Sequence, residues 1–216
     1  MPGVVNVVFR NCRLNYNGGS SDVVIRNGAT TNLPFVTFEH CQMDGSGAQD
    51  TAAVFSDIAE STYRYCHFHR WPKDVTGLST GTANQLFEYC FYEIWETNTT
   101  GGVHGDAWQS GQTCSNVRFY RCRWYCPWGF QGITANGCIQ DNTNGGNHTN
   151  IGAEECLFQG ANISVRLVAN ATSGFTYTGA YIKNCYFGRD TQNGTGGVWN
   201  VSGPHVGLVV CGNKWY

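Results

Sequence analysis

One short string pairs an imidazole with a carboxylate, two groups that often carry protons in enzymes. It reads His104-Gly105-Asp106-Ala107-Trp108-Gln109. Because side chains alternate along a β-strand, His104 and Asp106 would share the outer face, with Gly105 and Ala107 pointing inward. The carboxylate would favour the charged histidine and orient it for proton transfer. The alternative is that both side chains only stack on neighbouring strands and satisfy polar groups there.

Further aspartates can supply a second carboxylate to the same face. We expect Asp74, Asp106 and Asp141 on nearby strands, about 5 or 10 Å apart for one or two strand spacings. Those distances bracket the carboxylate separations of retaining and inverting glycosidases, so the three form the candidate acid set. The alternative places these aspartates in turns and loops. The candidates for binding a substrate or partner are Gln109, Trp108, Trp128, Asp57 and Arg166.

A repeated pattern around cysteine predicts the elements that position these residues. Eight cysteines follow the local pattern apolar–x–x–Cys–x–apolar, the last of them in the degenerate form LVVCGN, at intervals of about 24 to 34 residues. The apolar residues before each cysteine alternate as in a β-strand, and the alternation then restarts one residue late. Such a slip indicates a two-residue corner between two sheets. The eight are Cys12, Cys41, Cys66, Cys90, Cys122, Cys156, Cys185 and Cys211.

Each repeat continues into a loop rich in Gly, Asn and Thr and then a third short strand. We expect such third strands at Asp22–Ile25, Ala52–Phe55, Asn162–Val168 and Gly197–Val201. Three short strands per repeat without a helical pattern predict an all-β chain. The repeat further predicts a single-stranded right-handed parallel β-helix of about eight coils, which forms one domain over residues 1–216. The competing prediction, a β-sandwich or propeller, would need hairpin turns, whose Asn-Gly and Asp-Gly signals are scarce here.

The cysteines of the repeat are predicted to be free thiols buried in a ladder. Stacked side chains would hold their Cβ atoms about one strand spacing (~4.8 Å) apart, which is wider than the ~3.8 Å of a disulfide. Free thiols in turn indicate folding in a reducing compartment. Cys114, Cys126 and Cys138 fall outside the ladder, and loop thiols, one disulfide or part of a metal site all stay open for them. Without a C-x₂-C pair we expect no metal and no cofactor.

With its repeats aligned, the chain resembles the right-handed parallel β-helix superfamily, the pectate-lyase-like fold, from Val4 to about Val210. The polar corner residues Asn11 and Asn184 are similar to the short asparagine-bearing turn of that family. The string beginning at His104 looks like the HxDxxQ signature of β-helix proteins from phages and actinobacteria. The resemblance implies that the strand after the long loop belongs to the first sheet, whose outer face carries the groove in polysaccharide-cleaving members. The same architecture hosts lyases, hydrolases, adhesins and phage tail parts.

Composition argues against several classes of protein and partner. The chain has 13 basic and 15 acidic side chains and a formal net charge of −2, which gives no electrostatic footprint for nucleic acid. No run reaches the roughly 18 apolar residues of a membrane span, and we expect no signal peptide at the start. The 14% aromatic content argues against a long disordered chain, and the 28 glycines argue against a helical bundle.

These observations favour a structural protein over a free enzyme. We expect a component of a phage particle (tail, baseplate or head decoration), assembled in the bacterial cytoplasm, that binds other virion subunits and forms a homo-oligomer, a trimer as in related tailspikes. The repeat runs close to both termini, so we expect the ends of the column to dock on other subunits. Two alternatives stay open: a polysaccharide-cleaving hydrolase or lyase with its groove on the first sheet, and a secreted, extracellular adhesin that binds a glycan.

Overall fold

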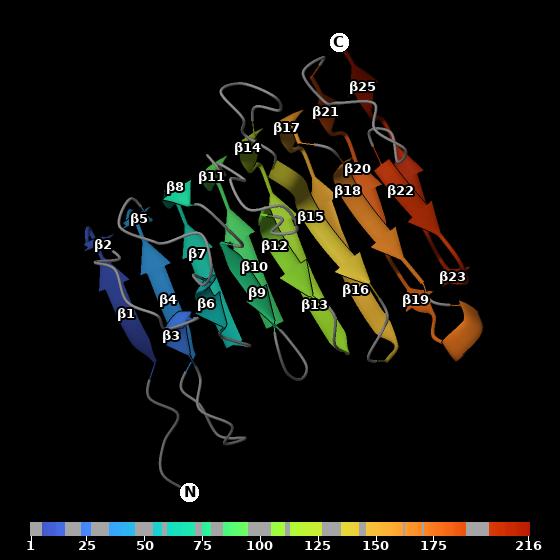
Figure 1. Ribbon diagram of the computed structural model, residues 1–216, viewed down its shortest axis with the longest axis horizontal. Coiled ribbons are helices and arrows are strands. Elements are labelled where there is room, and N and C mark those ends of the chain that lie inside the picture. Colours follow the sequence, from blue (N-terminus) through green and yellow to red (C-terminus); the bar gives the residue numbers. More distant parts are fainter. Residues whose placement is uncertain are drawn as a thin grey trace, which may run out of the picture.

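The structure, a computed structural model, consists of β-strands in three parallel sheets (Figure 1). All strand pairs within the described residues are parallel, and one short 3₁₀ turn spans Ala171–Ser173. The all-β prediction is therefore confirmed. The structure describes residues 6–15, 23–26, 35–45, 54–57, 60–71, 75–78, 84–94, 105–110, 113–126, 135–142, 146–161, 163–169, 171–188 and 199–216, and every structural statement below concerns these residues.

We label the three sheets A, B and C. Sheet A has ten of the described strands: β1 (Val7–Arg10), β4 (Val36–Glu39), β7 (Glu60–Arg64), β10 (Asn84–Glu88), β13 (Cys114–Tyr120), β16 (His148–Glu154), β19 (Tyr177–Thr178), β20 (Tyr181–Lys183), β23 (His205–Val206) and β24 (Val209–Cys211). Sheet B has eight: β2 (Arg13–Asn15), β5 (Gln42–Asp44), β8 (His67–Trp71), β11 (Phe91–Ile94), β14 (Arg123–Cys126), β17 (Leu157–Gly160), β21 (Tyr186–Phe187) and β25 (Lys214–Trp215). Sheet C has seven: β3 (Val23–Arg26), β6 (Val54–Asp57), β9 (Thr76–Leu78), β12 (Gly105–Ser110), β15 (Ala135–Asn142), β18 (Ile163–Val168) and β22 (Trp199–Ser202).

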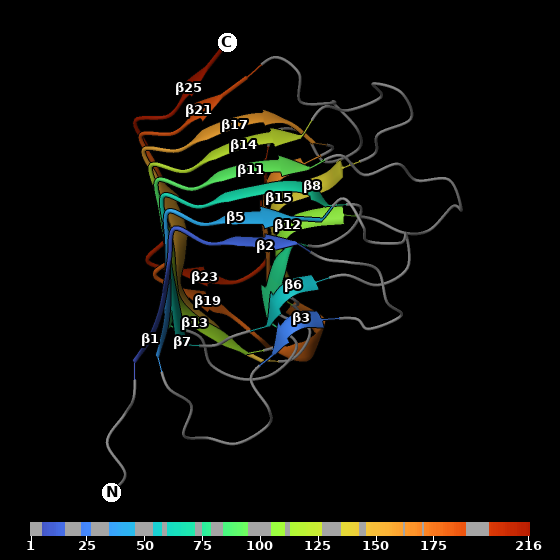
Figure 2. The same cartoon turned by 90° about the vertical axis from the view of Figure 1, so that its left-hand side faces the viewer.

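The chain visits sheets A, B and C in turn and then starts again beside its own first strands. From β1 to β15, each strand pairs with the strand three positions later, so that Val7 of β1 lies level with Val36 of β4. β16 pairs with both β19 and β20, so β17 and β18 pair with the strands four positions later, β21 and β22. Seen from the N-terminal side, sheets A and B meet at a corner and sheet C lies across the interior from sheet A (Figure 2). This arrangement is consistent with a β-helix-like solenoid, and the third strands lie within about two residues of their predicted places.

The corner between sheets A and B contains one residue with a left-handed backbone in each repeat. The angle φ is 56° at Asn11, 52° at His40 and 52° at Tyr65, and the same conformation recurs at Tyr89, Arg121, Glu155 and Asn184. The backbone N–H of His40 donates to the Arg64 carbonyl (3.0 Å), so strand-like pairing continues around the bend. A non-glycine residue with this φ is strained by roughly 1–2 kcal/mol. The corner predicted from the alternation slip is confirmed, and it explains why the inward alternation restarts there.

Seven cysteines occupy one inward position directly after the corner. Five of these thiols, from Cys41 to Cys156, donate to a backbone carbonyl of the preceding repeat: the Cys66 sulfur lies 3.4 Å from the Phe38 oxygen, and the Cys90 sulfur 3.3 Å from the Tyr63 oxygen. Burial raises the pKa of Cys41, which keeps that thiol protonated. The predicted ladder of free thiols is confirmed for Cys12, which is half-buried, and for the buried Cys41, Cys66, Cys90, Cys122, Cys156 and Cys185.

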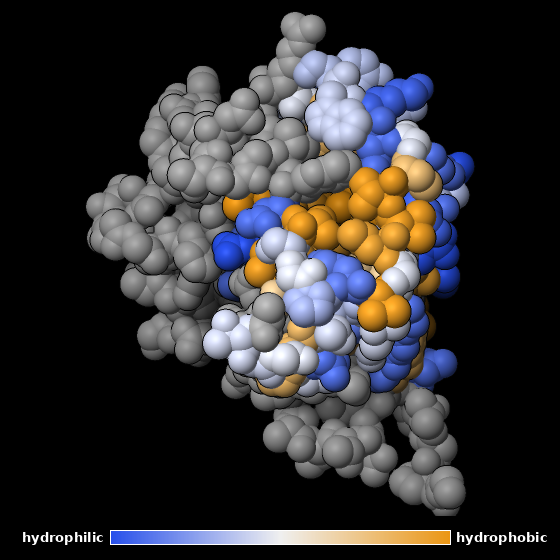
Figure 3. All heavy atoms as spheres, turned by 90° about the vertical axis from the view of Figure 1, so that its right-hand side faces the viewer, coloured by the Kyte–Doolittle hydropathy of each residue, from blue (hydrophilic) through white to orange (hydrophobic). Residues whose placement is uncertain are grey.

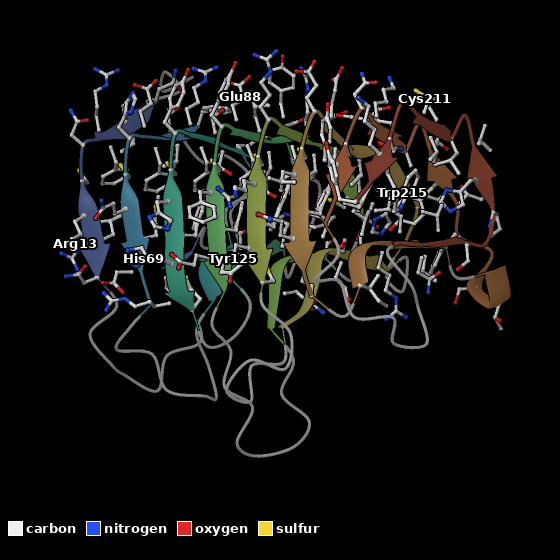
Figure 4. All side chains as sticks on the ribbon, turned by 90° about the horizontal axis from the view of Figure 1, so that it is seen from above. Arg13, His69, Glu88, Tyr125, Cys211 and Trp215 are labelled. Carbon is white, nitrogen blue, oxygen red and sulfur yellow. The ribbon has the colours of Figure 1, made fainter. Side chains whose placement is uncertain are left out.

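Cys211 is not part of this ladder, which corrects the prediction. It lies level with Lys183 and is exposed on the outer ridge that also carries Glu88 (Figure 4). Asn213 takes the ladder position instead. Its amide Nδ2 donates to the Ile182 carbonyl (2.9 Å), and its Oδ1 accepts from the Cys185 backbone N–H (2.8 Å). The last left-handed corner falls on Gly212 (φ 67°), after Cys211 rather than before it.

Two aromatic ladders fill the core beside the thiols. Trp124 lies in the second, with its ring centroid 5.4 Å from Tyr92 and 4.6 Å from Phe158. Stacked rings at this spacing add to the free energy gained by removing their apolar surface from water. The ladder on sheet A contains Phe9, Phe38, Tyr63, Phe87 and Phe119, and that on sheet B contains Phe68, Tyr92, Trp124, Phe158 and Phe187.

Candidate functional site

Asp106 and Trp108 lie on β12 and point into the core, where both are 0% exposed. The prediction that Asp106 faces solvent beside His104 is therefore wrong, and Trp108 is not available to stack on a sugar. Because neighbouring side chains alternate, the half-buried Gln109 lies on the outer face between Trp108 and Ser110, whereas Ala107 is 0% exposed and belongs to the core.

The size of Trp108 explains this orientation. Its indole packs edge-on against Phe119 across the interior, with ring centroids 5.8 Å apart. Its ring N–H donates to the side-chain oxygen of Gln85 (2.8 Å), so the buried donor is satisfied. Since a strand has a period of two, an inward Trp108 takes Asp106 inward with it. The apolar surface of the indole, rather than the polarity of the carboxylate, sets which face of β12 is buried.

The candidate acid set does not assemble on an outer face. Asp141, on β15, is 0% exposed like Asp106. The two carboxylates also lie in different rows, because Asp141 is level with Ser110 whereas Asp106 is level with Gly137. Asp106 and Asp141 therefore do not form the carboxylate pair that glycoside hydrolysis requires.

Four other predicted residues fall wholly or partly outside the described structure. His104, Asp74 and Trp128 lie outside the described residues altogether. Asp57 ends β6, level with Arg26 of β3, and its side chain is outside the described part. The placement of these side chains therefore stays a prediction.

Two of the predicted binding residues do come together on the outside of sheet C. Gln109, Gln140, Arg166 and Asn200 lie level with one another on β12, β15, β18 and β22. Their neighbours Val165 and Leu167 are in the core, so this row faces outward. Gln140 is nearly covered, and the other three are half-buried. The buried Nε of Arg166 has no hydrogen-bond partner among the described residues. We call Gln109, Gln140, Arg166 and Asn200 the outer polar row.

The interior holds an ion pair that could not be anticipated from the cysteine repeat. The Nδ1 atom of His148 lies 2.7 Å from Oδ2 of Asp141, and both side chains are 0% exposed. With its proton on Nδ1, His148 donates to the carboxylate, as expected for buried charges that must be hydrogen-bonded. This pair joins sheet A to sheet C, since His148 begins β16 and Asp141 is on β15.

His148 belongs to an inward row of chemically reactive side chains on sheet A. Cys114 precedes it on β13, and Tyr177 and His205 follow on β19 and β23. The Tyr177 ring stacks on His205 (centroids 5.1 Å apart, planes 8° apart) and is tilted against His148 at 5.1 Å. Burial raises the pKa of Tyr177, and the nearby Asp141 raises it further.

Cysteine, histidine and aspartate together are the residue types of a thiol nucleophile and its base. The geometry here does not allow that use. Cys114, His148 and Asp141 are all 0% exposed, so a substrate has no access to them in the described structure. Burial raises the pKa of Cys114, with Asp141 raising it further, whereas a reactive cysteine needs a lowered pKa. The row is a polar part of the core, and its His148–Asp141 contact joins sheet A to sheet C.

A second, weaker repeat in the sequence marks this row. Cys114-Ser-Asn-Val, His148-Thr-Asn-Ile and Tyr177-Thr-Gly-Ala begin at its first three positions. The third residue of each string has a positive φ, 57° at Asn116, 53° at Asn150 and 69° at Gly179. Asparagine and glycine are the residues that tolerate this conformation best, so their recurrence was the signal available for finding His148 and Tyr177.

The C-terminal end of the stack exposes apolar side chains and strand edges. β22, β23, β24 and β25 are the last strands of their sheets, and each pairs on one side only within the described residues. Figure 3 looks at this end and shows an apolar patch bordered by hydrophilic residues. Val206 is 60% and Trp215 53% exposed. We call the following set the C-terminal end surface: Val206, Leu208, Val209, Val210, Trp215 and Tyr216.

Among the described residues, no three His, Cys, Asp or Glu side chains are grouped so as to hold a metal ion. No helix there has the length and apolar character to cross a membrane. Comparison with protein families, with curated proteins and with solved structures finds no match for this chain.

Proposed function

We propose that this chain is a structural subunit of a larger assembly, a right-handed parallel β-helix of about eight coils with the pectate-lyase-like fold, and that the assembly is a phage particle. The observation that carries the structural role is the C-terminal end surface. Parallel strand edges and large apolar side chains at one end of a stack favour pairing with another chain. Cys114, His148 and Asp141 are 0% exposed, and Asp106 points into the core. Their burial further supports a structural role over a hydrolytic one.

A second copy of this chain is the partner that the geometry favours. At the other end of the stack, the first strands present the same inward rows: Phe9 and Leu14 are only partly buried there, and their counterparts at the C-terminal end, Val210 and Trp215, are exposed. If β24 and β25 of one copy paired with β1 and β2 of the next, Val210 would meet Phe9 and Trp215 would meet Leu14. Each copy would then continue the parallel sheets of its neighbour. This contact is heterologous, and it favours end-to-end association over the side-by-side trimer expected from the resemblance.

Sedimentation velocity of the purified chain over a range of concentrations tests this proposal. The wild-type protein should associate, and Val210→Arg should weaken the association at least about tenfold, because it places a charge in an apolar contact. Tyr65→Arg is the matched control: Tyr65 is 51% exposed but lies at the A–B corner, away from the ends, so association should be unchanged. A wild-type protein that stays monomeric at every concentration would overturn the proposal.

The outer polar row supports a second candidate function, binding of a glycan by an adhesin or by the particle itself. Polar side chains repeated once per strand spacing, about 4.8 Å, can hydrogen-bond to successive hydroxyl groups of a sugar chain. Arg166 is half-buried and is the charged member of this row. Because Asp106 and Asp141 are buried, we do not propose that they cleave the glycan.

A glycan-binding panel tests the outer polar row. If the row binds a glycan, Arg166→Ala should weaken binding about tenfold, the loss expected for one charge-assisted hydrogen bond. Arg118→Ala removes an exposed arginine from sheet A and should leave binding unchanged. Equal loss in both variants would show that binding is a general charge effect and would contradict a role for the row.

A further inference from the structure

Two cysteines outside the ladder lie side by side between sheets B and C. Cys126 ends β14, Cys138 lies on β15, and their sulfur atoms are 3.9 Å apart. Both side chains are 0% exposed. Cys114, the third cysteine whose state the sequence leaves open, lies in the inward row of sheet A beside His148. Of the three residues whose state the sequence leaves open, the structure therefore brings Cys126 and Cys138 together.

This pair differs from the ladder thiols in its surroundings. A ladder thiol such as Cys66 donates to backbone carbonyls, at 3.4 Å to Phe38 and 3.3 Å to Arg64, whereas the Cys138 thiol contacts the sulfur of Cys126. The pair also occurs at one level of the stack only. Cys126 is level with Gly160, and Cys138 lies between Ala107 and Ser164 in its row. Small neighbours on these strands leave space for the sulfur atoms to approach each other.

We propose that Cys126 and Cys138 form a disulfide by exchange with a small disulfide oxidant such as glutathione disulfide. The thiolate of one cysteine attacks a sulfur of the oxidant and releases one glutathione. The second cysteine then attacks the mixed disulfide and releases the other. One protein S–S bond forms, the oxidant S–S bond breaks, and the two thiol protons end on the two glutathione molecules. The protein is oxidised by two electrons, and the oxidant is reduced by two.

Burial determines when this exchange takes place. It raises the pKa of Cys138, and neither sulfur is accessible in the folded chain, so a dissolved oxidant reaches them slowly there. The bond therefore forms while the chain folds. Once formed, it joins two residues that are 12 positions apart and fixes the passage from sheet B to sheet C. Such a cross-link stabilises the fold by restricting the unfolded chain.

Refolding in a glutathione redox buffer, followed by acid quenching, alkylation in denaturant and mass analysis, tests the site. The Cys211→Ser background is used, because the exposed Cys211 would link molecules to one another. After alkylation, the refolded protein should carry two fewer alkyl groups than its fully reduced form, and one cross-linked peptide should join Cys126 to Cys138. Cys138→Ser in this background should fold without the cross-link, since the buried Ser164 already occupies the same row.

Two further measurements distinguish a Cys126–Cys138 cross-link from oxidation of the other thiols. Cys66→Ser removes a ladder thiol and should keep the Cys126–Cys138 cross-link. Oxidised protein should unfold at a higher denaturant concentration than the same protein after reduction, and this difference should vanish in Cys138→Ser. If Cys138→Ser does not fold, Cys126→Ala takes its place. Complete alkylation of the refolded protein, or cross-links spread over the ladder and Cys114, would overturn the proposal.

Discussion

Replacing Trp124 with alanine is expected to lower the free energy of unfolding by about 3–5 kcal/mol. The indole is 0% exposed and lies between Tyr92 and Phe158, with Phe119 packed edge-on at 5.4 Å. Alanine would leave a cavity at the middle of the stack, where strands on both sides prevent collapse. Urea unfolding followed by far-ultraviolet circular dichroism measures the loss without relying on the removed fluorophore.

Trp215→Ala provides the matched control for this prediction. Trp215 continues the same ladder, with its ring centroid 5.8 Å from that of Phe187, but it is 53% exposed at the C-terminal end (Figure 4). In the monomer its loss should cost less than about 1 kcal/mol, because little apolar surface returns to water. Equal losses for Trp124→Ala and Trp215→Ala would show that the end surface is covered in solution.

His148→Leu is the second substitution with a large expected effect, again about 3–5 kcal/mol of unfolding free energy. It removes the hydrogen bond of 2.7 Å between His148 and Asp141, so the buried carboxylate loses this partner. The penalty arises from the remaining charge more than from the lost bond. Denaturant titrations at constant pH, compared with the wild-type protein, measure it.

A double-mutant cycle identifies the cause of that loss. Asp141→Leu together with His148→Leu should be more stable than His148→Leu alone, because no buried carboxylate then lacks its histidine. The exposed pair Arg118–Glu154 (3.0 Å) is the control, and its removal should cost less than about 1 kcal/mol. A double variant that is no more stable than His148→Leu would mean that packing, rather than charge, causes the loss.

The general course of the chain could be predicted from sequence because one inward position recurs in almost every repeat. A thiol fits that position beside two aromatic ladders, so cysteine marked it from Cys12 to Cys185. The prediction was wrong at Cys211, since the pattern detects a cysteine between apolar residues and not the left-handed corner that must precede it. At the last repeat that corner is Gly212, which moves the ladder position to Asn213.

The candidate site was harder to predict, because hydropathy and strand alternation conflict in β12. The sequence places Asp106 and Trp108 on the same face, and the free energy of burying an indole outweighs the cost of burying the carboxylate. Polarity alone suggested the opposite face. By contrast, Gln109 and Arg166 were correctly assigned to nearby strands, since both lie on outward positions where no packing interaction opposes the pattern.

The recurrence of rows makes the length of this molecule adjustable in fixed steps. Within each sheet, the described strands pair only with their counterparts in the repeats before and after, so pairing extends from neighbour to neighbour along one dimension. Duplication of one internal repeat would lengthen the stack by about 4.8 Å and leave both end surfaces as they are. Loss of one repeat would shorten it equally. A gene of this kind can therefore act as a molecular ruler, in which the copy number of a short segment sets the distance between two unchanged attachment points.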